Sequence, residues 1–269
     1  MSATTTAPPR AGLAPLFAGI VRSEARKLGT VRSTAWALLA VVAFTVITAA
    51  LLGALLPGHL SAHQKAAIDS VRVSLGGLHL SQVAAGLLGV LAVTGEYSSG
   101  MIRATLAAVP QRRLLLTAKA LVTAAAVAVT GTAACLAAYL VFQAFLPAGD
   151  ALRTTLAGPG VLRAVLGAGL YLTVLALLGF GLGAVLRSSA GAVAVLFGAL
   201  FVPSLLAALL PSSWQDTIGP YLPMNAGDTL YTIRPEAHML GPWAGFGVFC
   251  LYATAALAAG FALIGRRDA

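Results

Sequence analysis

Long apolar stretches alternate with short polar ones along this chain, and the apolar stretches contain no Asp, Glu, Lys or Arg. They cover residues 36–56, 75–94, 120–146, 164–186, 190–210 and 242–265. A helix of about 20 apolar residues is long enough to cross about 30 Å of hydrocarbon. The pattern therefore predicts an all-α integral membrane protein with six transmembrane helices. Residues 36–265 are expected to form the transmembrane domain.

The polar interruption between the second and third apolar stretches covers residues 95–119. It holds five charged residues: Glu96, Arg103, Arg112, Arg113 and Lys119. A charge at the centre of a membrane helix costs about 2.5–3.5 kcal/mol, so this segment is expected outside the hydrocarbon. An apolar stripe at helical spacing (Tyr97, Met101 and Thr105, extended by Ile102, Leu106 and Val109) predicts a short amphipathic helix. Pro110 is expected to end that helix.

Residues 13–32 form a second amphipathic pattern, in which basic residues lie opposite an apolar side. A basic amphipathic helix next to a span usually lies flat at the membrane surface. The alternative is a simple charge cluster that only sets the orientation of the protein. We expect residues 1–35 to be a cytoplasmic tail plus this interfacial helix, and residues 266–269 to be a cytoplasmic C-terminus.

Composition and the placement of charge support a membrane protein. The chain is 59% hydrophobic and 9% charged, with a net charge of +9. Lys and Arg are most frequent in the segments that would be cytoplasmic if the N-terminus is inside, so both termini are predicted to be cytoplasmic. Because the basic residues flank apolar runs, membrane lipids are the expected partners and nucleic acid is not.

A few residues inside the apolar stretches suggest contacts between helices or a translocation path through the membrane. His79 and Gln82 share one face of the second stretch and either line a cavity or hydrogen-bond to a neighbouring helix. Pro203 is expected to kink the fifth helix. The GxxxG spacing of Gly179 and Gly183 favours close helix packing, either within the chain or as a dimer seam.

The sequence contains none of the common nucleotide-binding, catalytic or metal-binding motifs. The lysines Lys27, Lys65 and Lys119 are followed by Leu, Ala and Ala, so no Walker A sequence can be written, and GxSxG, HExxH and CxxC do not occur. We therefore predict neither an enzyme nor a metal site. Glu96 either pairs with Arg103 or a basic residue of the N-terminal helix, or is a solvated carboxylate.

Two stretches of the chain resemble a known family. They are VRSEARKLGTVRSTAWALLA (21–40) and GEYSSGMIRATLAAVPQRRLLLTAKAL (95–121), and they are similar to bacterial ABC transporter permeases of the type-2 exporter superfamily. The matching positions are Ser23, Glu24, Lys27, Arg32, Ser33 and Thr34, then Glu96, Tyr97, Gly100, Arg103, Thr105, Leu106, Pro110, Arg112 and Lys119. Met101 stands where Thr is commoner in the family.

The resemblance implies the transmembrane permease subunit of an ABC exporter, multi-pass in the bacterial plasma membrane. Its partners would be two separate ABC ATPase subunits, which bind ATP and Mg, and a second permease copy in a homodimer or heterodimer. This chain itself would bind no cofactor.

The resemblance also implies roles for individual residues. Residues 96–109 would be the coupling helix that contacts the ATPase, and residues 11–32 the connecting helix. The coupling segment would use Glu96, Tyr97, Gly100, Met101, Arg103, Thr105, Leu106, Pro110 and Arg112, the connecting helix Glu24, Lys27 and Arg32, and the translocation path His79, Gln82 and Pro203. A secondary transporter driven by an ion gradient is the alternative, but it would need an ionisable residue at mid-membrane depth, and only His79 qualifies.

Overall fold

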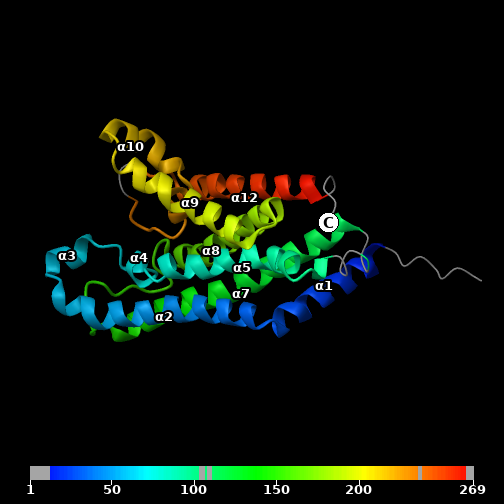
Figure 1. The fold of residues 1–269 in the computed structure, drawn as a ribbon. Helices are drawn as coiled ribbons and strands as arrows, with labels where there is room; N and C mark the ends of the chain where they lie inside the picture. Colours follow the sequence, from blue (N-terminus) through cyan, green and yellow to red (C-terminus); the bar gives the residue numbers. More distant parts are fainter. Residues whose placement is uncertain (1–12, 103–106, 108–110, 236–237, 265–269) are drawn as a thin grey trace, which may run out of the picture.

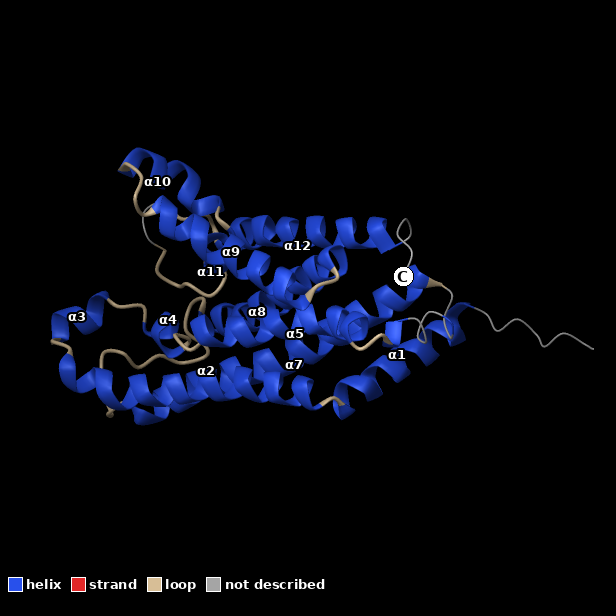
Figure 2. Ribbon diagram, viewed as in Figure 1, coloured by secondary structure: helices blue, strands red, loops and turns tan. Residues whose placement is uncertain are grey.

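The computed structural model describes residues 13–102, 107, 111–235 and 238–264, and over these ranges it contains helices and no strand (Figure 1, Figure 2). The elements in chain order are α1 (Leu13–Thr30), α2 (Arg32–His59), α3 (Ala62–Ala67), α4 (Ser70–Ser74), α5 (Leu78–Ser98), α7 (Arg112–Phe145), α8 (Val161–Leu186), α9 (Ser189–Ala207), α10 (Ser212–Ile218), η1 (Gly219–Tyr221), α11 (Pro223–Asp228) and α12 (Pro242–Ile264).

Six of these helices, α2, α5, α7, α8, α9 and α12, are long and apolar enough to cross a membrane. This confirms the prediction of six spans. The largest difference in a boundary is at α7, which begins at Arg112 although the apolar stretch begins at residue 120. Arg, Leu, Lys and Ala are good helix formers, so the helix extends past the apolar stretch into the polar segment.

The helix α8 lies at the centre of the bundle (Figure 1). In its most apolar window 67% of the residues are buried, and 61% in α5, against 22% in each of α2, α9 and α12. α8 packs against α5, α7, α9 and α12. Its Tyr171 ring stacks on Phe249 of α12 at a centroid distance of 5.2 Å. α8 and α5 are therefore the inner helices, while most residues of α2, α9 and α12 are only partly buried or exposed.

Glycines allow α8 to approach α5 closely. A Cβ added at Gly179 would lie 2.5 Å from the carbonyl oxygen of Gly86, and one at Gly183 would lie 3.0 Å from that of Val90. Both neighbours belong to α5. Gly179 and Gly183, which have GxxxG spacing, therefore lie where two helices of the same chain pack closely, which is the first of the two interpretations given for them above: packing within the chain.

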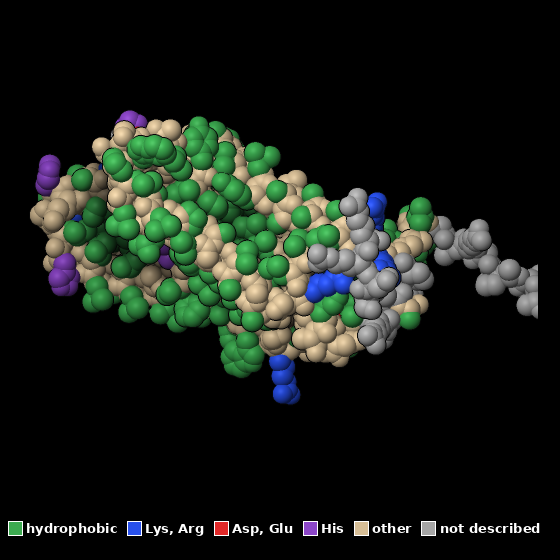
Figure 3. Space-filling view, turned by 45° about the horizontal axis from the view of Figure 1, so that its top comes forward, with side chains coloured by type: hydrophobic (Ala, Val, Ile, Leu, Met, Phe, Trp, Pro, Cys, Tyr) green, Lys and Arg blue, Asp and Glu red, His purple; other side chains and the backbone are tan. Residues whose placement is uncertain are grey.

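The two ends of the bundle differ in charge. α1 and the C-terminal end of α12 lie at one end, and α3, α4 and α10 lie at the other (Figure 1). On the face drawn in Figure 3, Lys and Arg side chains gather mainly at the α1 end, histidines lie at the opposite end, and apolar side chains cover the surface between them. The C-terminal end of α5 and the N-terminal end of α7 lie at the same end as α1 (Figure 1).

At the opposite end one carboxylate holds two distant segments together. Asp69 Oδ1 accepts hydrogen bonds from the backbone N–H groups of Val71 and Arg72, both at 3.1 Å. Its Oδ2 accepts from the N–H groups of Ile233 and Arg234, at 2.7 and 3.0 Å. The first pair caps α4, and the second fixes the segment that leads from α11 to α12.

Candidate functional site

Two charged residues of α1 face the bundle one helical turn apart. Glu24 is buried, with 4% of its surface exposed, whereas Arg22 and Arg26 of the same helix are exposed. Lys27 is half-buried, and its Nζ lies 2.9 Å from Glu24 Oε1. Residues three apart lie on the same helix face, so α1 presents an acid and a base together.

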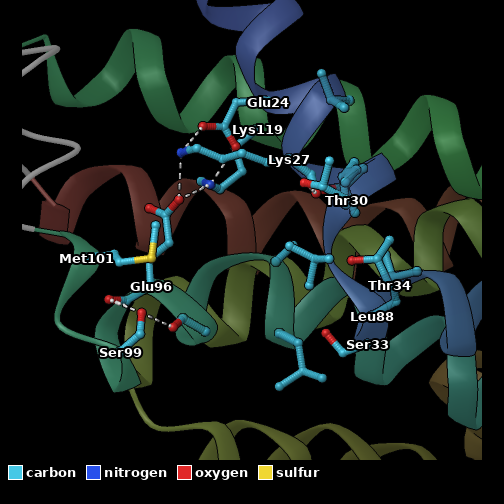
Figure 4. Close-up of a pocket in the computed structure, with 17 residues that line it drawn as sticks. Glu24, Lys27, Thr30, Ser33, Thr34, Leu88, Glu96, Ser99, Met101 and Lys119 are labelled. Atoms are coloured by element: carbon cyan, nitrogen blue, oxygen red, sulfur yellow. Dashed lines mark hydrogen bonds and ion pairs between the residues drawn. The ribbon is translucent and has the colours of Figure 1, made fainter.

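Two further charges reach the same place from α5 and α7. Glu96 lies in the last turn of α5 and Lys119 two turns into α7, and both are buried. Lys119 Nζ lies 2.6 Å from Glu24 Oε2 and 2.8 Å from Glu96 Oε1. Lys27 Nζ lies 3.0 Å from the same oxygen of Glu96. We call these four residues, which join three helices, the charge cluster (Figure 4).

The charge cluster is electrically balanced, and its members stabilise one another's charged forms. Burial by itself lowers the pKa of the Lys27 ammonium, but its hydrogen bonds to Glu24 and Glu96 reverse this effect and raise the pKa above its ordinary value. Removing one member of a buried ion pair typically costs about 3–5 kcal/mol, because the other charge is left uncompensated. The three helices are therefore held together firmly at this end of the bundle.

A cavity of about 520 Å³ lies beside the charge cluster (Figure 4). The residues that line it are Glu24, Lys27, Leu28, Thr30, Val31, Ser33, Thr34, Leu88, Leu91, Ala92, Gly95, Glu96, Ser99, Met101, Lys119, Val122 and Thr123. Two buried oxygen atoms in this lining, Glu96 Oε2 and Thr123 Oγ1, have no hydrogen-bond partner in the described part of the chain. The cavity thus combines apolar and polar lining residues, and two of its buried oxygens are left unpaired by the residues that the structure describes.

The structure brings together three of the predicted site residues, Glu24, Lys27 and Glu96. The hypothesis that Glu96 pairs with a basic residue of the N-terminal helix is confirmed, and that residue is Lys27. Lys119 was missing from the predicted coupling residues although it completes the cluster. The available signal was a lysine at the edge of an apolar stretch, which needs a partner when it is buried.

The predicted coupling helix differs from the structure at its start. Glu96 and Tyr97 belong to α5, which continues to Ser98, so the expected helix does not begin at Glu96. Gly100 then adopts a positive φ of 71°, a conformation that glycine tolerates without steric cost. Met101, which lines the cavity, lies beyond this break and is helical.

The remaining residues of the predicted coupling segment are separated from the cluster or fall outside the described ranges. Arg103, Thr105, Leu106 and Pro110 lie outside the described residues. Tyr97 packs beneath the Arg187 guanidinium, 5.2 Å from the ring centroid, and so contacts the turn between α8 and α9. Arg112 donates a 3.4 Å hydrogen bond to the carbonyl oxygen of Ile264, at the end of α12.

The expected N-terminal helix ends earlier than predicted. Val31 is extended, with φ −80° and ψ 115°, and separates α1 from α2. Arg32 is therefore the first residue of α2, is exposed, and is not part of the same helix as Glu24 and Lys27. The Gly29–Thr30–Val31 sequence explains the break, since glycine and β-branched residues are weak helix formers.

The three residues expected along a translocation path do not line the cavity. Gln82 is buried and accepts a 2.5 Å hydrogen bond from the hydroxyl of Tyr171, which supports the interpretation of a contact between helices. His79 is exposed near the start of α5. Pro203 lies half-buried within α9, and the helix continues past it to Ala207.

Comparison with protein-family models finds no matching family. A search of the curated proteins finds no match either.

Proposed function

We propose that this chain is the transmembrane permease subunit of an ABC exporter-type transporter in a bacterial plasma membrane. The proposal starts from the resemblance of residues 21–40 and 95–121 to type-2 ABC permeases. In such a complex, separate ATPase subunits hydrolyse ATP, and a second permease copy completes the transmembrane part.

The observation that carries the proposal is the charge cluster. It joins α1, which the resemblance assigns as the connecting helix, to the end of α5, where the coupling segment begins, and to the start of α7. A displacement of the coupling segment would be passed to all three helices together, because separating buried charges costs several kcal/mol.

The packing of α5 suggests how this movement would reach the rest of the bundle. ATP binding would draw the ATPase subunits together and move the segment that follows Ser98. α5 would tilt with it and would carry along the central helix α8, because the two helices are in close backbone contact at Gly179 and Gly183. Transport would require that these contacts differ in free energy between the inward and outward states.

The charge distribution supports placing the α1 end in the cytoplasm. Described basic residues at that end include Arg22, Arg26, Arg112 and Arg113 in addition to the two lysines of the cluster. An excess of Lys and Arg is typical of cytoplasmic segments. This orientation places the coupling segment on the side where ATP is available.

Co-purification provides the first test. A tagged full-length chain, expressed in its own host and extracted in several mild detergents, should bring down an ABC ATPase in about equal amount. Absence of an ATPase in all of these detergents would contradict the proposal.

Transport by variants provides the second test. Glu96→Ala and Arg103→Ala should lower ATP-dependent transport by the complex in vesicles and leave membrane insertion intact. Asp216→Ala is the matched control, because Asp216 is exposed and belongs to α10 at the other end of the bundle. Wild-type transport by both variants at the coupling segment would contradict the coupling role.

One observation favours the alternative of a secondary transporter. Asp228, at the end of α11, is buried, and burial raises the pKa of its carboxyl above the ordinary 3.8 in spite of a hydrogen bond from the Tyr231 hydroxyl. A buried carboxyl with a raised pKa is a suitable proton carrier. Transport that persists without ATP and stops when a proton ionophore is added would favour this alternative.

A further inference from the structure

The cavity beside the charge cluster has an unused charged acceptor. Both carboxylate oxygens of Glu24 are engaged, Oε1 by Lys27 and Oε2 by Lys119. In Glu96 both lysines share Oε1, at 3.0 and 2.8 Å, while Oε2 has no partner among the described residues. A carboxylate oxygen only accepts hydrogen bonds, so a ligand that fills this position must donate one.

A second buried oxygen in the lining belongs to the Thr123 hydroxyl, which can donate as well as accept a hydrogen bond. Thr123 is fully buried, and its hydroxyl oxygen also has no partner within the described ranges. A buried polar group without a hydrogen bond typically costs about 1–3 kcal/mol, so two such groups in one cavity favour an occupant. Glu96 Oε2 requires an N–H or O–H donor from the occupant, whereas the Thr123 hydroxyl can pair with either a donor or an acceptor.

The lining also contains apolar side chains from several helices, together with the hydroxyl groups of Thr30, Ser33, Thr34 and Ser99. Leu28, Leu88, Leu91 and Val122 line the cavity from α1, α5 and α7. The volume of about 520 Å³ lies within the range of about 300–1,000 Å³ that is usual for small-molecule sites. An amphiphile with a donor head and an apolar tail fits this combination.

A second hollow adjoins the first and adds a basic surface. It has a volume of about 310 Å³, is lined by Arg22 and Arg26 among others, and shares Lys27 and Thr30 with the cavity. Guanidinium groups bind phosphate well through paired N–H donors. A head group that carries both an ammonium and a phosphate could use the free carboxylate oxygen of the cavity and the arginine pair of the adjoining hollow.

We propose that this cavity binds a phospholipid with a primary-ammonium head group, such as phosphatidylethanolamine. The ammonium donates to Glu96 Oε2, the phosphate lies on the Arg22 and Arg26 side, and an acyl chain occupies the apolar part. The inference goes beyond the transport role and does not depend on it. Phosphatidylcholine is the informative comparison, because its trimethylammonium group has the same charge but no N–H.

Native mass spectrometry of the purified full-length chain tests the proposal. The protein is exchanged into detergent with equimolar phosphatidylethanolamine, phosphatidylcholine and phosphatidylglycerol, and the lipids that remain bound after micelle removal are counted. We expect about tenfold preference for phosphatidylethanolamine over phosphatidylcholine, which corresponds to about 1.4 kcal/mol. Equal retention of these two lipids would overturn the proposal, and so would a preference for phosphatidylglycerol, which would indicate a basic surface alone.

A cavity-filling variant locates the binding site. Gly95 lines the cavity, and a Cβ added there would meet no atom within 4 Å, so Gly95→Phe can enter the open space. The matched control is Gly247→Phe on α12, which also meets no atom within 4 Å but does not line the cavity. The preference should disappear in Gly95→Phe and persist in Gly247→Phe. An unchanged preference in a correctly folded Gly95→Phe protein would overturn the proposal.

A third variant tests the phosphate position. Arg22→Gln combined with Arg26→Gln changes two exposed side chains of α1 and leaves the charge cluster intact. We expect retention of phosphatidylethanolamine to fall severalfold. Full retention in this double variant would contradict the proposed placement of the head group. Because the lipid comparison uses wild-type protein, the test does not depend on the folding of any variant.

Discussion

Glu24 and Lys119 are 95 positions apart in the chain, yet their side chains meet at 2.6 Å. Both are buried, with 4% and 7% of their surface exposed. This contact fastens α1, which precedes the first span, to α7, which forms the third span. Glu96 of α5 joins the same cluster, so one buried group of charges fixes three helices at the α1 end of the bundle.

Lys119→Met should destabilise the protein, because the two buried carboxylates of Glu24 and Glu96 are then left with only the half-buried Lys27 of the charge cluster as a cation. We expect a loss of about 3–5 kcal/mol, seen as a lower thermal unfolding midpoint in detergent. Arg113→Met is the matched control on the same helix, since Arg113 is exposed, and it should change the midpoint little. An equal effect of the two substitutions would show that the cluster contributes nothing to stability.

Asp228 should make the free energy of unfolding decrease as the pH rises. Burial raises the pKa of its carboxyl above 3.8 in the folded protein, while nearby His79 and Arg72 act in the opposite direction. The folded state therefore keeps this proton over a pH range where the unfolded chain has lost it, and stability falls as the pH rises from 3.8 through the folded pKa.

Unfolding midpoints measured at several pH values check this prediction. The difference between wild type and Asp228→Asn should shrink or change sign as the pH rises, because the asparagine does not ionise. Asp216→Asn serves as the control, since its side chain is 48% exposed. A constant difference between wild type and Asp228→Asn at all pH values would contradict the raised pKa.

Gly179→Ala should disturb the contact between the two inner helices. The added methyl group would lie 2.5 Å from the backbone oxygen of Gly86, which cannot move aside alone. Overpacking of this kind typically costs about 1–3 kcal/mol. Gly198→Ala in α9 is the control, because its Cβ would meet no atom within 4 Å. Thermal unfolding midpoints of the two variants and wild type test this prediction. A wild-type midpoint for Gly179→Ala would contradict the close packing of α8 on α5.

Asp69→Asn should loosen the segment between α11 and α12. The asparagine side chain has only one acceptor oxygen, and that oxygen carries no full charge. Its NH2 group would face one of the two pairs of backbone N–H groups that Asp69 now accepts from, and donors cannot pair with donors. Hydrogen bonds to charged groups are worth about 1.5–3 kcal/mol each in proteins. Hydrogen exchange at Ile233 and Arg234 should become faster, while exchange in the middle of α8 stays unchanged. Unchanged exchange at both amides would mean that other contacts hold this segment.

Much of the fold could be predicted from the sequence because its strongest signal is local. An uncharged stretch of about 20 residues has few stable alternatives to a membrane-spanning helix, since a helix satisfies its own backbone hydrogen bonds. Helix ends were less certain. The apolar stretch shows where hydrocarbon could begin, but Arg112 to Lys119 continue the helix of α7 beyond that boundary.

The site could be predicted only in part. The sequence predicted that Glu96, an acid near the end of a span, is either paired with a basic residue or solvated, and it predicted the basic amphipathic pattern of residues 13–32. It contained no local signal that joins Glu24 to Lys119, because the distance between them in space is set by how α1, α5 and α7 pack.

The sequence by itself determined the number of candidate spans, the charge asymmetry and the resemblance to a family of permeases, because these depend only on residue types and their spacing along the chain. The tertiary structure alone decided that Lys119 completes the charge cluster, that Gly179 faces α5, and that Glu96 Oε2 and Thr123 Oγ1 remain unpaired beside a cavity. The physical reason is that a contact between distant residues depends on the rotation and crossing of whole helices, which many apolar sequences allow in more than one way.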